Sequence, residues 1–106
     1  MSYTKVNADD VEPVSDGLKF LRESLECDQL GLSVLDCEPG WEGMEHDHAD
    51  DGEEEVYYLV EGSATVIVEG EEISMEPRDA LRIAPDATRQ IQNGETETTF
   101  VLAGAP

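Results

Sequence analysis

The two histidines of the chain, His46 and His48, are separated by a single residue. On an extended strand this spacing places both imidazoles on one face, about 6 to 7 Å apart along the backbone. On a helix the same pair would point about 200° apart. Two imidazoles and one carboxylate form a facial ligand set that leaves open positions on iron, manganese and similar metals. Glu55 begins the next apolar run and is placed to supply the carboxylate, so the spacing predicts a metal site.

The six residues between His48 and Glu55 keep two other interpretations open. They are strongly acidic, so both histidines can also be exposed residues of an acidic loop that bind nothing. Glu53 and Glu54 lie close enough in sequence to replace Glu55 as a ligand. The spacing of the loop does not match an EF-hand, and we expect its carboxylates to be solvated rather than to bind calcium. These carboxylates belong to Asp47, Asp50, Asp51, Glu53 and Glu54.

The elements that would position these residues are short strands separated by turns. Apolar and polar residues alternate over stretches that glycine, proline or charged residues bound. The stretches cover residues 30–37, 55–60, 64–68, 73–75, 80–83, 89–93 and 98–102. With no convincing long helix between them, this pattern is typical of an antiparallel β-sandwich or a small β-barrel. We therefore expect an all-β fold.

We expect one domain over residues 17–106, preceded by an N-terminal arm over residues 1–16. The arm has little apolar periodicity, and a chain of 106 residues is too short for two separate cores. Residues 17–25 alternate weakly and can form a strand or a short helix, of which we favour the strand. Residues 55–70 are predicted as a hairpin that turns at Glu61 and Gly62, and a second turn is expected over residues 69–72.

The strand predicted at 55–60 is apolar on both faces. Tyr57 shares the face of Glu55, and the opposite face carries Val56, Tyr58 and Val60. Tyr57 would face the interior, either as core filling or as the wall of a ligand pocket. A strand with two apolar faces needs cover on both sides, so we expect a second subunit and a homodimer.

Composition argues against several classes of partner. Asp and Glu number 26 against 6 Lys and Arg, which gives a net charge of −20. Such a field repels nucleic-acid phosphates and anionic lipid surfaces. No apolar run approaches the ~20 residues that cross a bilayer, and no secretion signal is recognisable, so we expect a cytoplasmic protein. The even spread of carboxylates along the chain favours adaptation to strong salt, which screens their repulsion.

The spacing around the candidate ligands resembles a known motif. Gly40 is followed by five residues and then by His46 and His48, and Glu55 is followed by six residues and then by Gly62. This arrangement resembles the first motif of the cupin superfamily, which is written G-x5-H-x-H-x3,4-E-x6-G. The chain departs from it in one place, because six residues rather than three or four precede the glutamate.

Residues 78–93 keep only the outline of the second cupin motif, G-x5-P-x-G-x2-H-x3-N. The outline is carried by Pro77, Asp79, Pro85 and Asn93, whereas Arg78, Ala84 and Asp86 replace its glycines and proline. Arg89 stands where the motif has its fourth ligand, a histidine. An arginine has no lone pair to give a metal. Arg89 can hold a substrate anion against a three-ligand metal, pair with Glu55 in a metal-free pocket, or point outward to solvent.

The resemblance implies a small antiparallel β-barrel of the double-stranded β-helix or jelly-roll type, commonly a dimer. It implies that His46, His48 and Glu55 hold a divalent transition metal, which would be Fe, Mn, Ni or Zn, beside a small-molecule ligand. The activity stays unassigned, and so does whether the protein is an enzyme. One alternative is a metal-dependent oxygenase or isomerase of a small organic acid, with Arg89 and Tyr57 at the substrate. The other is a metal-free cupin that binds a small molecule.

Overall fold

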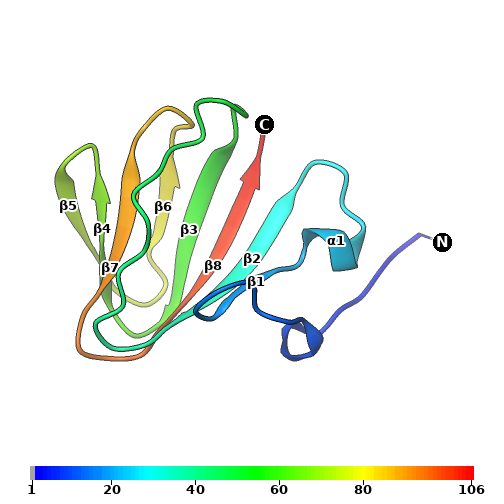
Figure 1. Ribbon diagram of the computed structural model, residues 1–106, viewed down its shortest axis with the longest axis horizontal. Helices are drawn as coiled ribbons and strands as arrows, with labels where there is room; N and C mark the ends of the chain where they lie inside the picture. The colour runs from blue at the N-terminus through cyan, green and yellow to red at the C-terminus, as the bar shows by residue number, and fades with distance from the viewer. Residues whose placement is uncertain (1) are drawn as a thin grey trace.

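The computed structural model describes residues 2–106 as two antiparallel β-sheets that face each other (Figure 1). The larger sheet has the strand order β1-β2-β8-β3-β6, and the smaller sheet has the order β5-β4-β7. The strands are β1 Leu18–Phe20, β2 Gly31–Cys37, β3 Glu54–Glu61, β4 Ala64–Val68, β5 Glu71–Met75, β6 Ala80–Ile83, β7 Arg89–Asn93 and β8 Thr98–Ala105. Helix is limited to a 3-10 turn η1 (Ala8–Asp10) and to α1 (Arg22–Leu25). Within residues 2–106, no helix is long and apolar enough to cross a membrane.

The core lies between the two sheets. Strand alternation sends Tyr57 and Leu59 of β3 and Phe100 of β8 inward, where they are almost completely buried. Val66 of β4 and Ile91 of β7 meet them from the smaller sheet. Burial of an apolar side chain of this size stabilises the fold by about 1.5 to 3 kcal/mol. The prediction of an all-β, antiparallel jelly-roll fold is confirmed.

The hairpin predicted over residues 55–70 is wrong. β3 pairs with β6 and β8 in the larger sheet, whereas β4 pairs with β5 and β7 in the smaller one. The turn at Gly62 carries the chain from one sheet to the other, and its φ of +91° is open to glycine at little cost. A tight turn between two strands does not by itself show that the strands pair.

The true hairpin forms one turn later, where a second turn is predicted. β4 and β5 pair from Ala64 opposite Met75 to Val68 opposite Glu71. Glu69 and Gly70 between them both have positive φ, 49° and 79°. Two such residues form the mirror-image turn whose twist matches that of the flanking strands.

Residues 17–25 also differ from the strand predicted there. Only β1 is strand, and the chain turns at Leu21 into the single helical turn α1. Leu21 is buried, whereas every residue of α1 is at least partly exposed. Glu26 ends α1 in the left-handed region at φ 60°, and its backbone N–H donates to the carbonyls of Arg22 and Glu23. A buried anchor in the middle of the segment therefore splits it into two short elements.

The outer face of the larger sheet is apolar and exposed. Val56, Tyr58 and Val60 are 38%, 38% and 44% exposed, because β3 turns their side chains away from the core. In register, Val101 of β8 lies opposite Tyr58, and Val34 of β2 lies opposite Val101. The two-faced apolar character predicted for residues 55–60 is therefore real, and only the inner face is covered within the chain.

A glycine substitution tests the crossing between the sheets. A Cβ on Gly62 would meet the carbonyl oxygen of Glu97 and the side chain of Thr98, whereas a Cβ on Gly70 would meet nothing. Both glycines have positive φ. We expect Gly70→Ala to lower the free energy of unfolding by about 1 kcal/mol, and Gly62→Ala to lower it by about 3 kcal/mol or more. Urea denaturation measures both, and equal losses would contradict this account of the crossing.

Candidate metal centre

The two histidines lie on an irregular segment that runs beside β7. His46 and Arg89 form an isolated bridge, in which each backbone N–H donates to the other's carbonyl, at 3.0 and 2.8 Å. Two residues on, the backbone N–H of His48 donates to the carbonyl of Pro85 at 2.8 Å. The extended backbone turns both imidazoles to the same side, with ring centroids 5.3 Å apart. This is the arrangement that the spacing of the two histidines predicts.

Glu55 approaches the histidines from the larger sheet. One nitrogen of each histidine and one oxygen of Glu55 all lie within 4.8 Å of one another, close enough to hold one metal ion. His46 is exposed, His48 is half-buried, and the Glu55 side chain is only 12% exposed. The three residues therefore form a cluster of one largely buried carboxylate and two more exposed imidazoles.

Glu54 cannot replace Glu55, because strand alternation points it to the outer face. There the Arg82 Nε donates to the Glu54 carboxylate at 3.0 Å. Glu53 belongs instead to a second group of ligand atoms with His48 and Asp51. Of the alternative carboxylates, only Glu53 thus stays near a histidine.

Hydrogen bonds orient both imidazoles. The His46 Nδ1 lies 3.0 Å from the carbonyl oxygen of Met44, and the His48 Nδ1 lies 3.1 Å from the carboxylate of Asp51. A carbonyl only accepts, so Nδ1 of His46 carries the proton and Nε2 presents its lone pair. Ligand histidines in proteins commonly have such a partner, which fixes ring orientation and tautomer.

Asp51 was expected to be a solvated loop residue, and its role at His48 is missed by the sequence motif. The backbone N–H of Glu53 donates to Asp51 at 3.0 Å, and this bond, followed by that of His48, lowers the pKa of the Asp51 carboxyl below its usual value. Asp51 therefore stays ionised and available to accept from His48. The residues inserted between His48 and Glu55 supply this carboxylate.

Arg89 is turned inward and is completely buried at 0% exposure. Its Nη1 donates to Oε1 of Glu55 at 3.0 Å, and its Nη2 donates to the carbonyl of Ala84 at 2.7 Å. Its Nε is buried and has no partner among residues 2–106. Of the three roles open to Arg89, the surface position is wrong. The geometry matches the pairing with Glu55.

Tyr57 adds a third neighbour to the same oxygen. Its hydroxyl lies 3.5 Å from Oε1 of Glu55, the atom that also faces Arg89 and His48. Burial, followed by the negative charge of Glu55, raises the pKa of Tyr57 well above its ordinary value. The hydroxyl thus stays protonated and donates to the carboxylate.

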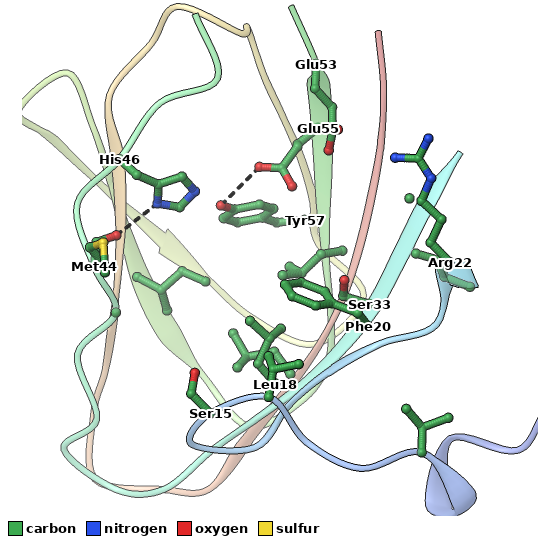
Figure 2. Close-up of a pocket in the computed structure, with 18 of the residues that line it drawn as sticks. Ser15, Leu18, Phe20, Arg22, Ser33, Met44, His46, Glu53, Glu55 and Tyr57 are labelled. Carbon is green, nitrogen blue, oxygen red and sulfur yellow. Dashed lines mark hydrogen bonds between the residues drawn. The ribbon is translucent and has the colours of Figure 1, made fainter. Parts of the chain in front are cut away.

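A cavity of about 880 Å³ opens beside this cluster (Figure 2). Figure 2 shows His46, Glu55 and Tyr57 at one end and the apolar Leu18 and Phe20 of β1 farther along. The described residues that line it include Tyr57 but not Arg89. The ligand cluster therefore faces a space large enough for a small molecule.

Residues 33–105 match the cupin domain family. This match covers well over half of the chain, so the protein belongs to the cupin family. A comparison of the chain with curated proteins finds no match.

Solved structures agree on the fold. A cupin protein from Bacteroides fragilis is 27% identical with a TM-score of 0.81, over 99% of this chain and 85% of that one. A structure described as a sugar phosphate isomerase from a cupin superfamily, from Silicibacter pomeroyi, is 23% identical with a TM-score of 0.78, over 96% of this chain and 75% of that one. A predicted oxalate decarboxylase from Thermotoga maritima is 19% identical with a TM-score of 0.79, over 96% of this chain and 98% of that one. The last two are similar in fold alone.

The buried ion pair can be tested against an exposed one of equal length. Arg89 and Glu55 are paired at 3.0 Å with side chains 0% and 12% exposed, and Arg82 and Glu54 are paired at 3.0 Å with side chains 64% and 56% exposed. Removal of one partner of a buried pair leaves an uncompensated charge, so Arg89→Met is expected to cost about 3 to 5 kcal/mol. Arg82→Met is expected to cost less than about 1 kcal/mol.

Denaturation in the presence of a chelator measures both variants without interference from metal. Losses of similar size would mean that the Arg89 guanidinium does not neutralise Glu55.

Proposed function

We propose that this cupin binds one divalent transition metal through His46, His48 and Glu55 and presents it to a small molecule in the adjoining cavity. Two imidazoles and one carboxylate suit Fe, Mn, Ni and Zn alike, so cellular availability decides which ion is taken. Three protein ligands leave coordination positions open toward the cavity. When bound, such an ion acts as a Lewis acid that polarises an oxygen of the ligand.

The observation that carries this proposal is the position of His48 between two carboxylates. Its Nδ1 lies 3.1 Å from Asp51, and its Nε2 lies 3.2 Å from Glu55. A neutral imidazole has one N–H and satisfies only one of them. With the proton on Nδ1 toward Asp51, the Nε2 lone pair faces the Glu55 oxygen. A cation held by His48 and Glu55 would remove that repulsion.

Arg89 fits beside such a metal as a partner of Glu55. Its contact, like those of His48 and Tyr57, is to Oε1, so none of the three uses the second carboxylate oxygen. We infer that Arg89 holds the ligand carboxylate in place. Of its other two nitrogens, Nη2 donates to the carbonyl of Ala84 and Nε is buried, and Arg89 is not among the residues that line the cavity. The anion-anchor role considered for an oxygenase or isomerase gains no support from this geometry.

A metal-free binding function is favoured by one specific contact. The Arg89 guanidinium already supplies a positive charge 3.0 Å from Glu55, as a metal would. In that case the cavity would hold a small molecule with Tyr57 and the histidines as its polar end. Metal binding separates the two candidates.

We expect the purified protein, loaded with Mn, Fe, Ni or Zn and dialysed, to retain about one ion per chain. His48→Ala is expected to weaken binding at least about tenfold, because it removes a ligand. Asp50→Ala is the matched control for adventitious binding by acidic groups, since Asp50 lies in the same loop but in neither ligand cluster. Elemental analysis and calorimetric titration in molar KCl measure all three proteins.

Retention of metal by His48→Ala, or equal losses in both variants, would contradict the site. No stoichiometric binding with any of the four metals would favour the metal-free function.

We further propose that the outer face of the larger sheet joins two copies of this chain in a cytoplasmic homodimer. The face is apolar over Val34, Val56, Tyr58 and Val101, in a chain of net charge −20 that repels itself elsewhere. A twofold axis through the face lets the same patch cover itself.

The oligomeric state tests this proposal. Tyr58→Lys places a charge in the centre of the apolar face and is expected to convert a dimer into a monomer in sedimentation equilibrium. Ser74→Lys adds the same charge on the exposed side of β5 and is expected to leave the dimer intact. A wild-type monomer at high protein concentration would overturn the proposal.

A further inference from the structure

The cavity beside the ligand cluster is apolar over most of its length. β1 contributes Leu18 and Phe20, β2 contributes Leu35, β8 contributes Leu102, and Trp41 comes from the segment that runs beside β7. The cavity volume of about 880 Å³ lies in the upper part of the ~300–1,000 Å³ range of small-molecule sites. A molecule of only a few heavy atoms would leave most of this apolar surface in contact with water.

The charges along the cavity disfavour an anionic ligand. Four carboxylates line it, those of Glu12, Glu23, Glu53 and Glu55, against the single guanidinium of Arg22. The Arg22 side chain already donates to the carbonyl of Asp28. An anion moved into an apolar space needs charged or multiple donors to offset its lost hydration. Away from the ligand cluster, neither a phosphate nor a dicarboxylate finds such donors in this lining.

One end of the cavity carries a cluster of polar groups. His46, Glu55 and the Tyr57 hydroxyl lie together there (Figure 2), and the His48 Nε2 lies 3.2 Å from Glu55. Away from this cluster the uncharged polar side chains are three small serines, Ser15, Ser24 and Ser33. A ligand that matches this distribution has one polar end and a large apolar body.

We propose that the cavity binds an uncharged amphipathic molecule of about two fused or linked rings. Its apolar body lies between Leu18, Phe20, Leu35 and Leu102, and a carbonyl or hydroxyl oxygen at one end faces His46 and Glu55. This inference rests on the proposed function only for the placement of the oxygen at the metal. The apolar chamber would hold the body of the ligand with or without an ion.

Two fluorescent probes with the same aromatic body test the proposal. N-phenylnaphthylamine is uncharged, and anilinonaphthalene sulfonate carries one negative charge on the same rings. We expect the uncharged probe to bind one per chain and at least about tenfold more tightly than the sulfonate. Trp41 is the only tryptophan of the chain and lines the cavity, so bound probe should quench its emission by energy transfer.

A matched pair of variants locates the probe. Ser33→Phe fills the cavity from β2 and is expected to weaken binding of the uncharged probe about tenfold. Ser74→Phe makes the same change on the exposed side of β5, away from the cavity, and is expected to leave affinity unchanged. Circular dichroism and thermal denaturation check that both variants are folded. Leu102→Phe provides a second filling variant should Ser33→Phe not fold.

The outcomes distinguish this proposal from the metal site. Tighter binding of the sulfonate, unquenched Trp41, or equal effects of Ser33→Phe and Ser74→Phe would overturn the apolar chamber even if metal binds. Probe binding that survives a chelator and the His48→Ala substitution supports the chamber even if no metal binds. Binding of the probe to the outer sheet face would appear as fluorescence that Tyr58→Lys removes and Ser33→Phe does not, and it would also overturn the proposal.

Discussion

One carboxylate oxygen is the point on which the site depends. Oε1 of Glu55 lies 3.0 Å from a guanidinium, 3.2 Å from an imidazole and 3.5 Å from a phenol hydroxyl. These three neighbours come from different parts of the fold, namely β7, the segment before β3, and β3 itself. A largely buried carboxylate is costly unless it is paired, so the contact with Arg89 of β7 holds the two sheets in one relative position.

The acidic segment after His48 contacts the candidate site and is not only a solvated loop. It is longer than in the cupin motif, and its Asp51 contacts the imidazole of His48. The same loop sets Glu53 toward the cavity and Glu54 toward the outer face. The longer segment thus gives the candidate ligand His48 a hydrogen-bond partner and leaves Glu55 in the cluster.

Local pattern was enough to predict the fold class and the candidate ligands. The period of two in the strands and the spacing of His46, His48 and Glu55 depend on neighbours in sequence, and both survive in the structure. Strand pairing depends on partners far along the chain, which explains the wrong hairpin at residues 55–70. The partner of Arg89 lies 34 residues away and could not be chosen from three alternatives.

Two positions of the second cupin motif, Asn93 and Arg89, have different roles in the structure. Asn93 keeps its place because its amide donates to the carbonyls of Glu38 and Thr96, while its oxygen accepts from Thr98. The bonds with Thr96 and Thr98 close the turn between β7 and β8, and the bond to Glu38 ties this turn to the end of β2. Asn93 therefore stabilises the fold, whereas Arg89 contacts the candidate ligand Glu55.

The N-terminal arm gives the cavity one wall that is separate from the sheets. Val11 and Val14 line the cavity, yet none of residues 2–16 is buried. Segments with little buried surface open at a small fraction of the free energy of global unfolding. Local opening of the arm would therefore uncover this wall of the cavity while the sheets stay folded. Access to the cavity and persistence of the fold then depend on different parts of the chain.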